Sequence, residues 1–218
     1  MAEGDDVAFL RGNNTTSADL QNHPVLNEVT AYWEALRSGA TIPYRSDVDP
    51  RGIQRALKNA FILERMAPGM ARLRVAGQTL SELMGMEMRG MPVSALIDPD
   101  TREPFRRALE EVFLGPTTAT LRLRSDGGYG KPALEAQMIL LPLRGDAGKV
   151  TRILGALVHQ GRVGRAPRRF HLEGSFLRKL DRQDEHKRLT HEAPELDYLD
   201  IKTIPTRHAH LRLVVTDD

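Results

Sequence analysis

In two segments of the chain, 133–143 and 151–160, the odd-numbered and the even-numbered positions are both largely apolar. In the first segment, for example, the successive residues Met138 and Ile139 are both apolar. Successive side chains of a strand point to opposite faces of a sheet, so a sheet built from these segments has two apolar faces. Both faces must be covered in the folded protein.

Two kinds of cover are available elsewhere in the chain. Short helical segments can cover one face. The other face is left to an amphipathic helix over 25–36, which contains the only Trp, or to a second subunit. We therefore expect a homodimer built on this second face. The residues expected at its interface are Val25, Val29, Tyr32, Trp33 and Leu36 of the helix and Ile139 and Leu141 of the sheet.

The expected elements follow the order strand, strand, several short helices, a longer helix and three strands. Pro68-Gly69 marks a tight turn between the first two strands, and Gly115-Pro116 ends the longer helix. The expected strands cover 60–66, 71–77, 117–124, 133–143 and 151–160, and the expected helices after the amphipathic one cover 51–57, 78–84, 93–97 and 100–114.

Composition narrows the class of protein. The chain has 218 residues, a formal net charge of +2 and no Cys, which excludes disulfides, thiolate metal sites and cysteine nucleophiles. The first residues carry acids where a secretion signal carries Lys or Arg, and no apolar run approaches the length of a membrane span. We expect a soluble cytoplasmic protein.

Four segments differ in composition. We predict a disordered lead over 1–21, an N-terminal helical flank over 22–58, a domain over 59–160 and a charged C-terminal extension over 161–218. The basic run 162–169 could contact nucleic acid. A soluble linker is the favoured interpretation, because no nucleic-acid-binding motif accompanies the run.

Motifs for catalysis or metal binding are incomplete. The glycine-rich segment 124–132 lacks the spacing of a phosphate-binding loop and leads into a strand, so a hairpin turn is favoured. His208 and His210 have no third ligand at an identifiable spacing, so no metal site is predicted. No acid–base pair or nucleophile motif stands out, and we do not expect an enzyme.

Four blocks in register resemble the PAS domain family. They are YWEALRSG (32–39), IPYRSDVDPRGI (42–53), RLRVAGQTLSELMGMEMRGMPVSALI (72–97) and ILGALV (153–158). Together they resemble small bacterial proteins that consist of one PAS domain and little else. The resemblance implies an α+β fold with a five-stranded antiparallel sheet and short helices on one face, here joined to an N-terminal amphipathic helix and a charged C-terminal extension. It also implies a sensory or interaction module.

The resemblance raises the question of a cofactor. PAS domains that hold flavin covalently, or a thiol-linked chromophore, need a Cys, so its absence excludes both. Haem is not expected, because haem-binding members commonly use a His of the long helix and 100–114 contains none. Nothing in the sequence supports a non-covalent flavin. His159 stands alone at a strand end, where a solvated side chain is the favoured interpretation.

In a PAS fold the expected ligand pocket lies between the sheet and the short helices. The alternation of side chains along the expected strands and the spacing of apolar residues along the expected helices predict which residues line it. They are Phe61, Leu63, Leu73, Val75, Leu80, Leu83, Met84, Met88, Leu96, Phe105, Leu109, Leu123, Met138, Leu140, Leu154 and Ala156. The leading hypothesis is a module that binds a small, mainly apolar ligand or a signalling protein, with output through dimerisation or partner contact. The alternatives are a ligand-free interaction scaffold and a nucleic-acid-associated regulator acting through the basic tail.

Half of the eight Met residues lie in the segment 84–92. If this segment is locally helical, Met84 and Met88 face inward together and Met86 is exposed near Glu87. Flexible Met side chains fill irregular gaps, so we expect them to pack at the wall of the pocket.

Overall fold

The computed structural model describes residues 20, 22–37, 42–180, 203–205 and 212–214. The chain divides into two units, Met1–Arg182 and Gln183–Asp218. In the second unit, strands β7 (Thr203–Pro205) and β8 (Arg212–Val214) pair antiparallel. His208 and His210 lie outside the described residues.

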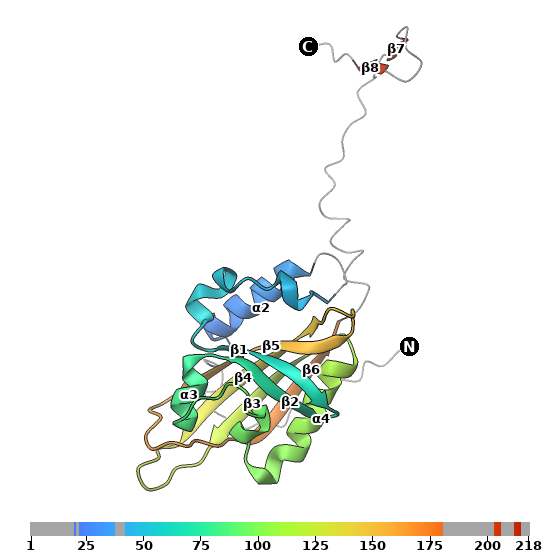
Figure 1. The fold of residues 1–218 in the computed structure, drawn as a ribbon. Coiled ribbons are helices and arrows are strands. Elements are labelled where there is room, and N and C mark those ends of the chain that lie inside the picture. Colours follow the sequence, from blue (N-terminus) through green and yellow to red (C-terminus); the bar gives the residue numbers. More distant parts are fainter. Residues whose placement is uncertain (1–19, 21, 38–41, 181–202, 206–211, 215–218) are drawn as a thin grey trace, which may run out of the picture. The chain divides into compact units, whose positions relative to one another are not determined.

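The first unit is built on one six-stranded sheet with the strand order β2-β1-β5-β4-β3-β6, and all of its pairs are antiparallel (Figure 1). The strands are β1 (Ala60–Ala67), β2 (Met70–Ala76), β3 (Thr117–Ser125), β4 (Leu134–Arg144), β5 (Val150–Gln160) and β6 (His171–Lys179). The helices are α2 (Pro24–Leu36), η1 (Arg45–Asp47), η2 (Pro50–Ala56), α3 (Gln78–Met84), η3 (Val93–Leu96), η4 (Pro99–Thr101) and α4 (Arg102–Leu114). The expected α+β architecture, an antiparallel sheet with several short helices, is confirmed.

Helices α3 and α4 cover one face of the sheet, which we call the inner face (Figure 1). Helix α3 ends at Gly85, whose φ of 68° is the left-handed conformation that glycine adopts without steric cost. Met84 and Met88 are buried in the core on this face, whereas Met86 is exposed. Met84 and Met88 therefore pack inward although Met88 lies beyond the end of α3, and a pocket wall at this position stays a prediction.

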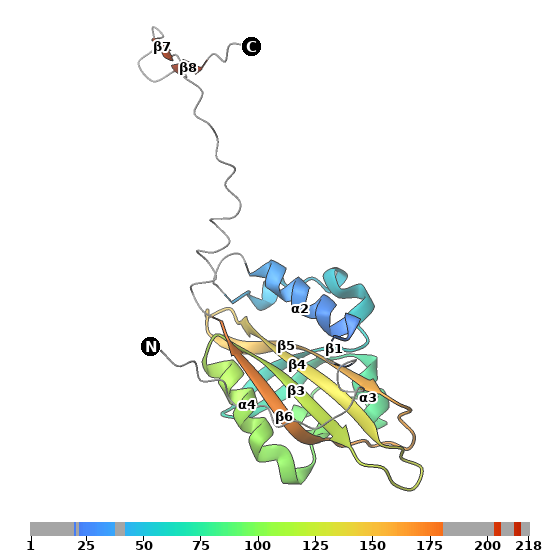
Figure 2. The ribbon, with the colours of Figure 1, turned by 180° about the vertical axis from the view of Figure 1, so that it is seen from behind.

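Helix α2 covers the opposite, outer face, on the other side of the sheet from α3 and α4 (Figures 1 and 2). His23 caps the helix by accepting from the backbone N–H of Val25, and Pro24 occupies its first turn. Trp33 is fully buried, and its Nε1–H donates to the carbonyl of Pro142 on β4 at 2.9 Å. The chain thus covers its second apolar face with its own helix.

This arrangement changes the interpretation of the residues assigned to a dimer interface. Val29, Trp33, Ile139 and Leu141 are buried against one another within one chain, and Val25, Tyr32 and Leu36 are half-buried beside them. The apolar pattern could not distinguish the helix from a second subunit as the cover, because either would bury the same side chains.

A sixth strand extends the sheet beyond the five that were expected. Strand β6 pairs with β3 at the edge of the sheet (Figure 2) and falls within the segment that the sequence indicated as a charged extension. Its side chains are mostly exposed, so its pattern lacks the apolar alternation by which strands are recognised. Phe170, directly before it, is fully buried in the inner core.

Arg168 holds the connection between β5 and β6 in place. Its guanidinium is buried and donates to the hydroxyl of Ser125 and to the carbonyls of Val163 and Pro132, while its backbone N–H donates to Leu83. One residue of the basic run therefore serves packing and is not available to a nucleic acid.

We predict that Trp33→Phe lowers the free energy of unfolding by about 1–3 kcal/mol, because it removes a hydrogen-bond donor and part of a large buried ring. Denaturant unfolding followed by circular dichroism measures this change. Tyr129→Phe is the matched control, since Tyr129 is 96% exposed. An unchanged midpoint for Trp33→Phe would mean that α2 is not packed on the sheet as described.

We predict that Arg168→Met lowers the free energy of unfolding by about 2–4 kcal/mol, because the buried hydroxyl of Ser125 and two backbone carbonyls lose their donor. Its neighbour Arg169 is exposed, so Arg169→Met should change stability by less than about 0.5 kcal/mol. Equal midpoints for the two variants in a thermal melt would contradict the structural role of Arg168.

Candidate functional site

The structure brings most of the residues assigned to a ligand pocket into one apolar cluster on the inner face, which we call the inner cluster. Its members from that assignment are Phe61, Leu63, Leu73, Leu80, Leu83, Met84, Met88, Leu96, Phe105, Leu109, Leu123, Met138 and Leu140. All of them are buried, and most have no exposed surface. They pack as a core between the sheet and the helices.

Three of the assigned residues lie elsewhere. Val75 is paired with Ile62 and is 49% exposed, and Leu154 and Ala156 are buried on the outer face beneath α2. The β5 residues that face inward are Ile153 and Leu157. Because β5 is apolar at both parities, only its pairing with β1 decides which residues face inward.

Gly155 explains why this register is the one adopted. It is paired with Phe61, and a Cβ at this position would lie 2.2 Å from the Phe61 ring. The absence of a side chain lets the ring lie over β5 on the inner face. Leu154 and Ala156 are then placed on the outer face by strand alternation.

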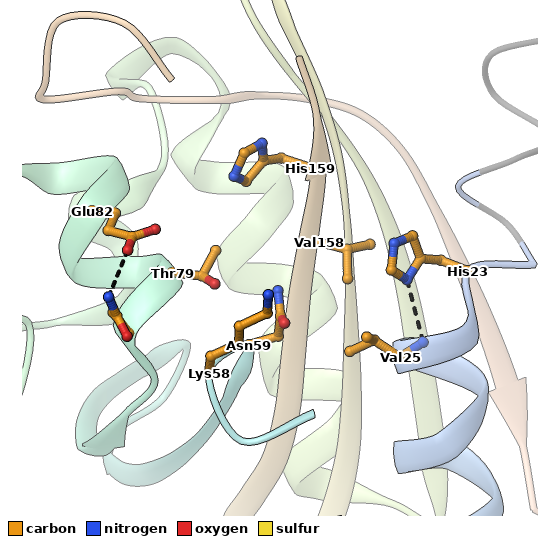
Figure 3. A pocket seen from close by; sticks show the side chains of 9 residues that line it. His23, Val25, Lys58, Asn59, Thr79, Glu82, Val158 and His159 are labelled. Atoms are coloured by element: carbon orange, nitrogen blue, oxygen red, sulfur yellow. Dashed lines mark hydrogen bonds between the residues drawn. The ribbon is translucent and has the colours of Figure 1, made fainter. Parts of the chain in front are cut away.

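Outside the inner cluster, a pocket of about 510 Å³ lies where β5 ends, and we call it the end pocket (Figure 3). Thr79, Glu82 and His159 lie on the α3 side of β5, and His23 and Val25 lie on the α2 side (Figure 3). The pocket therefore touches both layers that cover the sheet. Its walls are His23, Val25, Lys58, Asn59, Gln78, Thr79, Glu82, Val158 and His159.

Asn59 extends the pairing of β1 with β5 by one residue. Its backbone carbonyl accepts from the N–H of Leu157 at 3.0 Å, and its side-chain Nδ2 donates to the carbonyl of Leu157 at 2.9 Å. The side-chain oxygen Oδ1 is buried and has no hydrogen-bond partner among the described residues. The end pocket thus contains a buried acceptor that lacks a donor.

The pKa values of two histidines of the end pocket are lowered, which favours the neutral imidazole. Burial lowers the pKa of His159, the charge of Arg168 adds to this, and the backbone of Gly161 and the carboxylate of Glu82 oppose it. Burial also lowers the pKa of His23. Within the described structure, the buried Nδ1 of His159 accepts or donates no hydrogen bond.

A second pocket, of about 400 Å³, lies beside the turn between β3 and β4. Gly128, Gly130 and Lys131 of that turn line it together with Arg162 and Gly164. The glycine-rich segment forms this turn and leads into β4, as the sequence predicted. Lys131 Nζ donates to the carbonyl of Pro167, so this cation supports the neighbouring connection.

The outer face carries a cluster of charges that the sequence did not reveal. The carboxylate of Glu64 contacts the guanidinium groups of Arg72 at 2.6 Å, Arg152 at 2.7 Å and Arg74 at 2.9 Å. Burial raises the pKa of Glu64, but the hydrogen bond from Arg72 and the charges of the three guanidinium groups outweigh it and lower the pKa overall.

The sequence also did not single out Lys58, Asn59, Thr79 and Glu82 as site residues. Lys58 and Asn59 lie in the turn before β1, Thr79 and Glu82 lie on α3, and only the fold brings the two pairs together. His159 was noticed as the one His of the predicted sheet, yet a strand-end position gives no indication of neighbours. Within the described residues, no three His, Cys, Asp or Glu side chains gather into a set that could hold a metal ion.

The comparison with known families agrees with the fold. The profile of the PAS domain family matches residues 21–158, which is more than half of the chain, and the chain belongs to this family. No match was found among curated proteins. In the parts of the chain that the structure describes, no helix has the length and apolarity needed to cross a bilayer.

Similar solved structures are light-oxygen-voltage domains. The light-state structure of the blue-light photoreceptor Aureochrome1 LOV is 17% identical, covers 51% of this chain and 88% of its own, and has a TM-score of 0.37. A light-oxygen-voltage domain from a study of its mechanism with a flavin analogue is 21% identical. The match covers 51% of this chain and 84% of that domain's chain, with a TM-score of 0.37. An RNA-binding light-oxygen-voltage receptor is 23% identical, with a TM-score of 0.38. The match covers 50% of this chain but only 32% of the receptor chain.

At such identities the likeness is one of fold. The expectation on cofactors, which excluded covalent flavin because the chain has no Cys, is corrected here: the similar structures are light-oxygen-voltage domains, one of them studied with a flavin analogue. Absence of Cys removes a point of thiol attachment and leaves the rest of the fold unchanged.

We predict that Glu64→Gln lowers the free energy of unfolding by about 1 kcal/mol at neutral pH, because three guanidinium groups lose their counter-charge. The pKa of Glu64 is depressed in the folded state, so the stabilisation is present above its ordinary pKa and is lost as the pH falls through the lower folded-state value. Urea titrations over a pH series should therefore show the two proteins converging at acid pH.

Glu111→Gln is the matched control for this series, since Glu111 is exposed on α4. Its stability should follow that of the wild type at every pH. A difference between wild type and Glu64→Gln that grows toward acid pH would contradict the assigned ion cluster.

Proposed function

We propose that this PAS domain is a sensory or signalling module whose output element is the helix α2. The observation that carries the proposal is that α2 covers the outer face through a single apolar cluster, which we call the outer cluster. Leu20, before α2, and Leu180, after β6, both pack in this cluster. The first and last described residues of the first unit therefore pack with the same helix.

An ion pair adds a second link between α2 and the last strand. Arg178 of β6 donates to the carboxylate of Glu34, which also pairs with Arg37 at 2.9 Å. A displacement of α2 would break this contact and change the environment of β6. This coupling supports a route by which a change at α2 reaches the segment that follows β6.

Removal of α2 would uncover the apolar outer face of the two central strands. Ile139 and Leu141 of β4 and Leu154 and Ala156 of β5 lie there. Such a surface is suited to a partner protein or to a second copy of the chain. We therefore keep a homodimer as one form of the output, with displacement of α2 as its requirement.

The input is proposed to be a small ligand, as for the sensory class of PAS modules. The dense packing of the inner cluster favours a second candidate function, a ligand-free interaction scaffold that works through the same helix. Neither function needs a catalytic residue, and we propose a non-enzymatic role. Native mass spectrometry of the purified chain distinguishes the two: a retained small molecule supports the sensor, and bare protein mass throughout supports the scaffold.

Native-state hydrogen exchange tests the role of α2. We expect the amides of α2 to exchange through an opening of lower free energy than that of the amides of β4 and β5, because an output helix must separate without global unfolding. Acrylamide quenching of Trp33, the only Trp, gives an independent measure of the same opening. Exchange of α2 only through global unfolding would refute the proposal.

Arg178→Gln sharpens this test, since an exposed ion pair contributes up to about 1 kcal/mol. Exchange of the α2 amides should become about two- to fivefold faster, while β4 and β5 remain unchanged. Arg169→Gln, at an exposed position outside α2 and β6, should leave α2 exchange as in the wild type.

A further inference from the structure

The end pocket has a polar floor and a charged rim. Asn59 and Thr79 are 7% and 5% exposed, so they form the floor, whereas Lys58 and Glu82 are exposed and stand at the rim. One cation and one carboxylate therefore line the same pocket at exposed positions. A pocket of about 510 Å³ is within the size range of small-molecule sites.

The orientation of the Asn59 amide is fixed by its own hydrogen bond. Nδ2 donates to the carbonyl of Leu157 at 2.9 Å, and the flipped amide would place two acceptors against each other. Oδ1 therefore remains a buried acceptor without a donor, in a residue that lines the pocket. A buried acceptor without a partner is costly, so the floor is suited to a ligand that brings an N–H group.

The histidines give the pocket further polar capacity without adding charge. His159 has a buried Nδ1 without a partner, and His23 uses its Nδ1 to accept from Val25, which leaves its Nε2 as a donor in the neutral ring. The carboxylate of Glu82 is oriented by Gln78, whose Nε2 donates to it at 2.8 Å. Among the residues that line the pocket, the charged groups are those of Glu82 and Lys58, while the charge of Arg168 reaches His159 from outside the lining.

We propose that the end pocket binds a small zwitterion of the free amino acid class. Its ammonium group donates to Asn59 Oδ1 beside the carboxylate of Glu82, and its carboxylate accepts from Lys58. An anion alone would face Glu82, and a cation alone would face Lys58, so only a ligand with both charges matches the rim. Since His23 and Val25 belong to the start of α2, the bound ligand touches the proposed output helix directly.

This site goes beyond the proposed function, because it assigns an input that the role of α2 does not specify. The test is a titration of the ¹⁵N-labelled full chain followed by NMR, with glycine and γ-aminobutyrate as zwitterionic probes and with acetate and ethylamine as probes of single charge. We expect saturable shifts of the Asn59 side-chain amide and of the Thr79 and His159 backbone amides with a zwitterion. Acetate and ethylamine should bind at least about tenfold more weakly.

Variants at the rim test the charges without disturbing the core. Glu82→Gln and Lys58→Gln should each weaken zwitterion binding by about tenfold, whereas Glu111→Gln and Lys149→Gln, at exposed positions elsewhere, should leave it unchanged. Two outcomes would overturn the proposal: no saturable shift at the end pocket with either zwitterion, or equal binding by the rim variants and the controls. Neither outcome bears on hydrogen exchange of α2, so the proposed function is tested separately.

Discussion

The pairing of β4 with β5 is the constraint on which the rest of the structure depends. These central strands are apolar on both faces, so a layer is required on each side of the sheet. The inner layer comes from the helices between β2 and β3, and the outer layer comes from α2. The close approach of Phe61 to Gly155 sets which side chains of β5 meet which layer.

Covering both faces creates the end pocket where the two layers reach the end of β5. There the pairing of β1 with β5 ends at Ala60 and Ala156, and Asn59 continues it to Leu157 with its backbone carbonyl and its side-chain amide. The oxygen of the same amide is buried and has no hydrogen-bond partner among the described residues. The polarity of this site is thus a consequence of how the sheet ends, and its contact with α2 relates it to the proposed output.

Much of the positive charge in this chain has a structural role. Arg168 replaces missing donors at the β5–β6 connection, and Arg72, Arg74 and Arg152 surround one carboxylate on the outer face. A count of Lys and Arg along the chain cannot separate such residues from cations that are free to bind a partner. For this reason the basic run 162–169 is a weak indication of nucleic-acid binding.

The sequence by itself determined the order of elements, the need for two covering layers and the inward placement of most inner-cluster residues, because these follow from local apolar periodicity and from turn residues such as Gly85. Resemblance in four blocks added the family. The sequence could not determine the face on which Leu154 and Ala156 lie, since a strand that is apolar at both parities carries no signal of orientation. Nor could it identify β6, whose side chains are mostly exposed.

Only the tertiary structure decided that the chain's own helix covers the outer face, and that Lys58, Asn59, Thr79, Glu82 and His159 share one pocket. Such contacts join residues far apart in the chain, and their energies depend on strand register and layer packing, which local patterns do not encode.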